Sequence, residues 1–143
     1  MFDQALKILL IEDNPGDARL IREELSEAGS WSFVIDWVPS LAMGVERLAQ
    51  GGIDLVLLDL GLPDSQGFET FVKAQAQAPQ VPFVLLTGLN DETLALAAVR
   101  RGAQDYLVKG EADGRLLLRA IRYATERKRV EEALRKAHEE LER

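Results

Sequence analysis

Acidic, hydroxyl and amine side chains directly follow short apolar segments at four places in this 143-residue sequence. Glu12 and Asp13 follow the first of these segments, and Asp59, Thr87 and Lys109 each follow a later one. Clustered acids repel one another unless a cation lies among them, and hard oxygen ligands favour Mg²⁺. An ionised aspartate can attack phosphorus as a covalent nucleophile, while an ammonium group and a hydroxyl neutralise the transferring oxygens. The set suits metal-dependent phosphoryl transfer if the fold brings its members together.

The apolar segments have the length of strands and alternate with stretches of helical pattern. Three are apolar on both faces, which is typical of strands buried in a parallel sheet that helices cover. Two more are favoured as strands by aromatic or β-branched residues or by a preceding turn signal. The expected strands are 6–11, 31–37, 53–58, 81–86 and 105–108, and the expected helices are 15–28, 40–50, 67–77, 91–101 and a fifth that begins near 113.

Glycine and proline mark the ends of several expected helices. Gly29, the Gly51-Gly52 pair and Gly102 stand where helices end, and Pro15 stands where a first helical turn tolerates proline. The resulting (βα)5 order predicts an α/β fold, a doubly wound five-stranded parallel sheet with the flavodoxin-like strand order 2-1-3-4-5. Such sheets bind ligands beyond the carboxyl ends of their strands, which is where the candidate residues stand.

The fifth helix shows no stop signal before the last residue, so it extends for roughly 45 Å, further than the sheet can cover. Apolar residues recur along it at alternating spacings of four and three, a heptad seam interrupted by one arginine. This seam is Leu116, Ala120, Tyr123, Arg127, Val130, Leu134, Ala137 and Leu141. A second stripe, Leu117, Ile121 and Ala124, is expected to pack on the sheet. We therefore expect a domain at 1–125 and a projecting, coiled-coil-like extension at 126–143.

Composition narrows the class of protein. Hydrophobic residues make up 47% and charged residues 29%, as in soluble globular chains. Cysteine is absent, so disulfides and thiolate sites are excluded. We find neither an apolar run of membrane-spanning length nor a basic leader, and we expect a cytoplasmic protein. The net charge of −7 argues against nucleic-acid binding, although basic residues slightly outnumber acidic ones from 113 onward.

Four motifs carry a resemblance to a known family. They are Ile11-Glu12-Asp13-Asn14, the stretch LLDLGLPDSQG at 57–67, Leu86-Thr87-Gly88 and Tyr106-Leu107-Val108-Lys109. In this order, at the ends of four expected strands, they resemble the signature of bacterial response-regulator receiver domains. The resemblance covers about residues 5 to 125.

The resemblance implies a phosphoacceptor in a two-component phosphorelay. Asp59 would receive the phosphoryl group, and Lys109 would pair with it. Mg²⁺ or Mn²⁺ would be held by Glu12, Asp13, Asp59 and the backbone carbonyl of Gly61. The phosphodonor would be a histidine kinase or a phosphotransfer protein, and the chain would be a regulatory domain and not an enzyme.

The resemblance also implies a switch. The hydroxyl of Thr87 would move toward the phosphoryl group and the ring of Tyr106 would turn inward, which alters the face of the fourth helix, fifth strand and fifth helix. The change would pass through the C-terminal helix, where a homodimer could form. The chain would be a stand-alone relay or the amino-terminal receiver of a longer protein.

Three features depart from the family pattern. Glu12 stands where aspartate is more usual, and its longer side chain is expected to orient a metal-bound water. Gly110 stands where the family generally has proline, so a cis peptide after Lys109 would cost about 2.5 to 4 kcal/mol. Gly61 and Leu89 occupy positions that modulate phosphoryl lifetime, and glycine offers no shielding side chain there.

Other readings remain open at this stage. Glu12 and Asp13 could cap the helix that begins near Pro15, and Tyr106 could be an ordinary core aromatic. His138 is followed by an acid, as in some phosphohistidine sites, but lies in a charged helix face.

At the level of function, the main alternative is an interaction module that dimerises without phosphorylation. An aspartyl phosphatase would need an acid where Gly61 stands, and a flavodoxin would need a phosphate loop where the first acids stand.

Overall fold

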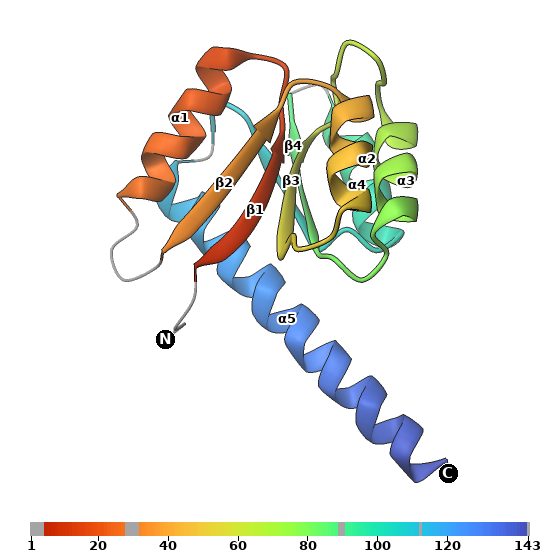
Figure 1. Cartoon of the computed structure of the whole chain (residues 1–143). Helices are drawn as coiled ribbons and strands as arrows, with labels where there is room; N and C mark the ends of the chain where they lie inside the picture. The colour runs from red at the N-terminus through yellow and green to blue at the C-terminus, as the bar shows by residue number, and fades with distance from the viewer. Residues whose placement is uncertain (1–4, 28–31, 89–90, 112, 143) are drawn as a thin grey trace.

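The computed structural model describes residues 5–27, 32–88, 91–111 and 113–142. Strands and helices alternate along it, as Figure 1 shows. They are β1 (Leu6–Ile11), α1 (Pro15–Ser26), β2 (Phe33–Val38), α2 (Leu41–Ala49), β3 (Leu55–Asp59), α3 (Phe68–Gln77), β4 (Phe83–Thr87), α4 (Glu92–Arg100), β5 (Asp105–Val108) and α5 (Gly114–Leu141). All strand pairs are parallel and the order is β2-β1-β3-β4-β5. The expected doubly wound sheet is confirmed.

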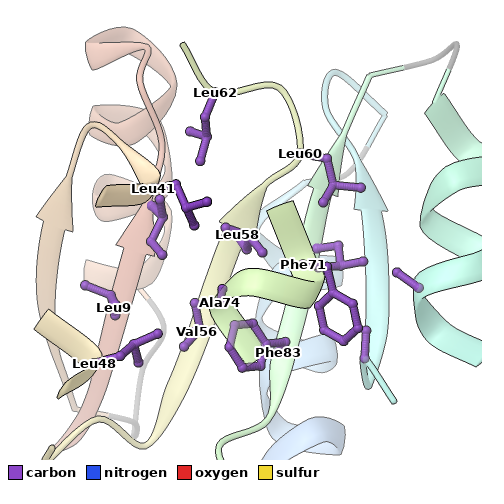
Figure 2. Packing of buried hydrophobic residues seen from close by; sticks show 14 of the residues in the cluster. Leu9, Leu41, Leu48, Val56, Leu58, Leu60, Leu62, Phe71, Ala74 and Phe83 are labelled. Carbon is purple, nitrogen blue, oxygen red and sulfur yellow. The ribbon is translucent and has the colours of Figure 1, made fainter. Parts of the chain in front are cut away.

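The sheet has a hydrophobic core on each face, which is why its central strands are largely apolar on both faces. Ile8 and Leu10 of β1 pack in the cluster beneath α1 and α5, whereas Leu9 and Ile11 pack in the cluster beneath α2, α3 and α4. Figure 2 shows the second cluster, with Phe71 of α3 set against the sheet. Burying each large aliphatic side chain contributes about 1.5–3 kcal/mol. Residues that alternate along a strand therefore stabilise opposite layers.

The third and fourth strands begin later than the sequence predicts. The expected ranges 53–58 and 81–86 are observed as Leu55–Asp59 and Phe83–Thr87. Pro82 has no N–H to donate to a neighbouring strand, although its carbonyl accepts a hydrogen bond from Val56 N. As a result, Asp59 and Thr87 are the last residues of their strands and not the first residues after them.

The first helix is capped by Asn14, which the sequence pattern did not single out as a cap. Asn14 Oδ1 accepts hydrogen bonds from the N–H groups of Gly16 and Asp17, at 2.8 and 3.1 Å. The cap is therefore Asn14, and the capping interpretation of Glu12 and Asp13 is wrong. The helix ends at Ser26 and not at residue 28.

The other helix ends largely agree with the expected stop signals. Gly102 follows α4 with φ of +119°, a left-handed conformation that favours glycine. The Gly51-Gly52 pair after α2 also has positive φ. Gly29 and Trp31, predicted as a helix stop and a strand start, lie outside the described residues.

The fifth helix is continuous for 28 residues and extends well past the sheet in Figure 1. Its stripe of Leu117, Ile121 and Ala124 is buried as expected. Ala120, assigned to the heptad seam, is buried as well, because it faces the same core cluster. Val130 is partly exposed, and Leu134 and Leu141 lie largely in solvent. Among the described helices, none has an apolar stretch sufficient to cross a membrane.

Candidate functional site

The carboxyl ends of four strands meet at one edge of the sheet. In the parallel register Ile11 pairs with Leu58, and Thr87 pairs with Val108. The residues that end or follow these strands must therefore converge, and a backbone hydrogen bond of 2.8 Å from Lys109 N to the Thr87 carbonyl ties two of the strand ends together.

Lys109 lies at the centre of this edge. Its Nζ is 2.6 Å from Glu12 Oε2, 3.1 Å from Asp59 Oδ2 and 3.2 Å from Asp17 Oδ2. The contacts to Asp59 and Asp17 are hydrogen bonds, while the one to Glu12 is an ion pair whose angles do not satisfy a hydrogen bond. The sequence predicted the convergence of Glu12, Asp59 and Lys109 but not the contribution of Asp17.

Glu12 is a fully buried carboxylate. Its Oε1 accepts a hydrogen bond from Asn14 N at 3.1 Å, whereas Oε2 has none among the described residues. Burial, and to a lesser degree the charge of Asp59, raises the pKa of Glu12 from 4.5 to about 7 against the opposing effect of Lys109. The protein groups around Glu12 therefore only partly offset the cost of burying its negative charge.

Burial lowers the pKa of Lys109, but its contacts with Glu12 and Asp59 outweigh that effect and leave the pKa above its usual value. Lys109 is therefore a permanent ammonium ion at neutral pH.

The acids of this site fit a divalent cation. Glu12, Asp13 and Asp59 each present a carboxylate oxygen, and these oxygens lie within 4.8 Å of one another. The set is purely oxygen, it surrounds a buried oxygen without a hydrogen bond, and it combines buried with exposed groups. Hard cations such as Mg²⁺ select this donor set.

Gly61 lies beside Asp59 in a short turn. Its N–H donates to Asp59 Oδ1 at 3.0 Å, which orients that carboxylate. Gly61 also forms an isolated antiparallel bridge with Gln66, whose two hydrogen bonds run from Leu62 N to the Ser65 carbonyl and from Gly67 N to the Leu60 carbonyl. Neither of these bonds uses the carbonyl of Gly61.

The hydroxyl groups of the two expected switch residues have hydrogen-bond partners other than Asp59. Thr87 Oγ1 donates to the Gly88 carbonyl at 2.9 Å. Tyr106 is half-buried, and its hydroxyl donates to Glu92 Oε2 at 3.3 Å. Partial burial and then the Glu92 carboxylate raise the pKa of Tyr106. Both hydroxyls thus have partners away from the acid cluster.

Three further predictions concern Gly110, Leu89 and His138. The Lys109-Gly110 peptide is trans, and Gly110 has φ of +87°, so this loop depends on glycine and not on a cis bond. Leu89 lies outside the described residues. His138 is exposed on α5 and pairs with Glu142 one turn later, as an ordinary helix-surface residue does.

A comparison with protein-family models matches residues 8–121 to the "Response regulator receiver domain". The chain belongs to this family. Members are regulatory domains of two-component systems, so the resemblance inferred from the four motifs is confirmed.

Among curated proteins, this receiver domain is 35% identical over 121 residues to the KDP operon transcriptional regulatory protein KdpE of Escherichia coli K12. The match covers 82% of this chain and 52% of KdpE. It is 33% identical over 104 residues to the swarming motility regulation protein RssB of Serratia marcescens, covering 73% of this chain and 46% of RssB. The chain thus spans about half the length of the curated relatives that it matches.

Solved structures agree with this assignment. A response regulator receiver domain protein from Clostridium thermocellum superposes with a TM-score of 0.78 at 27% identity, covering 87% of this chain and 98% of that one. NtrX from Brucella abortus gives 0.79 at 26% identity, covering 94% of this chain and 30% of NtrX. The fold and its order of elements are therefore those of known receiver domains.

Two site contacts were not predicted from the sequence. Asp17 reaches Lys109 across 92 positions of the chain, and Trp37 Nε1 donates to the Glu12 carbonyl at 2.6 Å. The position of Asp17 in the first turn of α1, one turn after the paired acids, was the available signal. Nothing in the sequence around Trp37 marks its contact.

Proposed function

We propose that this domain accepts a phosphoryl group on Asp59 from a histidine kinase or a phosphotransfer protein, with Mg²⁺ or Mn²⁺ bound. The observation that carries the proposal is the placement of Asp59 Oδ2 3.1 Å from Lys109 Nζ, beside two further carboxylates. Asp59 is nearly buried, with 6% of its surface exposed, at the edge of the sheet where a small donor would approach. Catalysis by positioning and charge neutralisation needs this arrangement.

The transfer is a substitution at phosphorus. An Asp59 carboxylate oxygen forms a bond to phosphorus as the P–N bond to the donor imidazole breaks, and the bonding electron pair stays on the imidazole nitrogen. Lys109 loses its carboxylate partner on Asp59 and turns the freed N–H toward a phosphoryl oxygen. Gly61 N holds the other carboxylate oxygen in place.

Glu12, Asp13, Asp59 and the Gly61 carbonyl would hold the divalent cation. When bound, the cation supplies positive charge against the phosphoryl oxygens. The close approach of three carboxylate oxygens, one of them on the fully buried Glu12, supports this assignment.

The signal then passes to the face of α4, β5 and α5. Thr87 and Tyr106 are proposed as the switch residues, and their present partners, the Gly88 carbonyl and Glu92, are exchangeable contacts at that face. Each contact is a single hydrogen bond of one hydroxyl, so a new charge on Asp59 can bias the equilibrium between these partners and others.

The projecting part of α5 is proposed as the output. We divide the chain into a receiver at 1–125 and a helical extension at 126–143 whose exposed Val130, Leu134 and Leu141 form an association surface between two copies. KdpE is a transcriptional regulatory protein, and a connection of this receiver to a transcriptional output is part of the proposal.

The decisive experiment is labelling by acetyl phosphate with Mg²⁺ present. Wild-type protein should acquire one acid-stable, base-labile phosphoryl group and Asp59→Asn should acquire none. Asp36→Asn is the matched control, because Asp36 is an aspartate of β2 that pairs with Arg47 away from the site. Labelling of Asp59→Asn at another residue refutes the assignment.

Light scattering with and without beryllofluoride and Mg²⁺ separates the main alternative. The proposal requires a change in association when the phosphoryl mimic binds. Association that is equally strong with and without beryllofluoride would identify an interaction module that works without phosphorylation.

A further inference from the structure

The ammonium group of Lys109 is shared by three carboxylates and not by two. It has three N–H donors, and carboxylate oxygens of Glu12, Asp59 and Asp17 lie 2.6 to 3.2 Å from it. The first two belong to the cation-binding cluster, which consists of Glu12, Asp13 and Asp59. Among the described residues, Asp17 is the one carboxylate partner of Lys109 that lies outside that cluster.

Asp17 is held in position by its own backbone. It lies in the first turn of α1, where its N–H donates to Asn14 Oδ1 at 3.1 Å. Its side chain is 43% exposed, so Asp17 can point into the site while staying hydrated. This placement makes the carboxylate available to Lys109 at little desolvation cost.

A divalent cation changes what the other two carboxylates can do. Glu12 Oε2 and the Asp59 carboxylate are drawn to the cation, which competes with the ammonium group for the same oxygens. Phosphorylation would then replace the Asp59 carboxylate with an acyl phosphate, whose phosphoryl oxygens would become the partners of Lys109 on that side. Asp17 lies outside the cluster, so we expect its contact with Lys109 to persist through both events.

We propose that Asp17 is a positioning residue that keeps Lys109 beside Asp59 when a divalent cation occupies the acid cluster. This inference rests on the proposed phosphoacceptor function. Asp17 touches neither the donor nor the phosphoryl group; it acts through Lys109. Without Asp17, the flexible side chain of Lys109 would move away from Asp59 once the cation binds Glu12.

A different role is conceivable for an acid at this position. Aspartate in a first helical turn stabilises the helix through its dipole. Such a role would depend on the charge alone, so Asp17→Ala and Asp17→Asn would lose it equally. The two roles are separated by comparing Asp17→Ala and Asp17→Asn, because asparagine retains an oxygen that accepts a hydrogen bond from Lys109 but carries no charge.

The first measurement is the rate of acetyl phosphate labelling at saturating Mg²⁺. Asp17→Ala should lower the maximal rate by roughly ten-fold, within the range that misplacing a reacting group costs. Asp17→Asn should recover part of that loss. Glu23→Ala, which removes the same charge from the same helix at an exposed pair with Arg19, should label like the wild type.

The second measurement does not depend on phosphorylation. The ¹⁵N signal of the Lys109 ammonium group is followed while Mg²⁺ is added. In the wild type the signal should persist at saturation, and in Asp17→Ala it should broaden or disappear. Mg²⁺ affinity, read from Trp37 fluorescence in a Trp31→Phe background, should stay within about two-fold of the wild type, because Asp17 is not a cation ligand.

Several results would overturn the inference. An Asp17→Ala protein that labels at the wild-type rate and keeps its Lys109 signal in Mg²⁺ rules it out, and so does a Mg²⁺ affinity that falls ten-fold or more. Equal losses in Asp17→Ala and Asp17→Asn, with Glu23→Ala labelling like the wild type, would indicate a helix effect. If the wild type itself is not labelled on Asp59, the proposed function fails, whereas the Lys109 signal still tests the position of the ammonium group.

Discussion

Arg127 donates a hydrogen bond from Nη1 to the main-chain carbonyl of Gln104, 3.1 Å away. Gln104 directly precedes β5, and Arg127 lies less than one turn after Ala124, the last buried residue of α5. The arginine that interrupts the heptad seam therefore has a partner within its own domain. This hydrogen bond connects α5 to the residue that precedes β5, at the point where the helix extends beyond the sheet.

Replacing Arg127 with leucine should strengthen self-association through α5. The substitution removes the contact with Gln104 and joins Tyr123 to Val130 by a continuous apolar seam. A newly buried leucine contributes about 1.5–3 kcal/mol, so the dimer dissociation constant should fall by roughly ten-fold or more. Sedimentation equilibrium measures it, with Arg129→Leu as the control that changes the same charge outside the seam. Equal shifts in both variants would contradict the seam as the association surface.

Asp64 caps a helix from a distant loop. Its carboxylate oxygens accept hydrogen bonds from Leu41 N and Ala42 N of α2, both at 2.9 Å. Asp64→Ala should therefore lower the free energy of unfolding by about 1 kcal/mol. Urea denaturation at pH 7 measures this, with Glu46→Ala, an exposed acid of the same helix, as the control. No difference between the two variants would exclude the capping role.

The Asp64 cap should also depend on pH. The hydrogen bonds from Ala42 and Leu41 lower the pKa of Asp64. A depressed carboxyl pKa stabilises the fold above the unfolded value of about 3.9, and this stabilisation is lost as the pH falls through the folded pKa. The stability gap between wild type and Asp64→Ala should thus be full at pH 6 and should shrink below about pH 4. A gap that stays constant down to pH 3 would show that the carboxylate charge is not involved.

The sequence predicts the sheet and the main site because both follow from local pattern. Strands that are apolar throughout require helices on both faces, and parallel strands place their final residues at one edge. Glu12, Asp59 and Lys109 were found in this way.

The contacts of Asp17, Asp64 and Arg127 could not be found in this way. Each depends on which rotamer reaches a partner from another element, and no spacing rule encodes that. The starts of β3 and β4 were predicted wrongly for a related reason. Pairing with a neighbouring strand, and not hydrophobicity, decides where these two strands begin.

Lys109→Met should destabilise the protein when no divalent cation is present. The substitution leaves the buried Glu12 carboxylate without its ammonium partner, as well as removing the partner of Asp59. Breaking a fully buried pair costs about 3–5 kcal/mol, and we expect about 1–3 kcal/mol because Lys109 is partly exposed.

Mg²⁺ should narrow this difference because a bound cation replaces the missing charge. Thermal denaturation with EDTA and with saturating Mg²⁺ measures both effects, with Lys7→Met on an exposed position of β1 as the control. A Lys109→Met protein as stable as the wild type in EDTA would mean that Glu12 is protonated or hydrated without the lysine.

Gly61→Met should lengthen the lifetime of the phosphorylated state. A Cβ at Gly61 would lie 3.9 Å from Asp59 Oδ1, an ordinary contact, and the backbone there does not require positive φ. A thioether side chain in that position shields the acyl phosphate from attacking water, so hydrolysis should slow by several-fold, on the order of 0.5–1 kcal/mol in the barrier. Loss of label after the donor is removed gives the half-life, and Gln66→Met, across the bridge from Gly61, is the matched control. An unchanged half-life in Gly61→Met, with labelling otherwise normal, would show that water reaches the phosphoryl group from another direction.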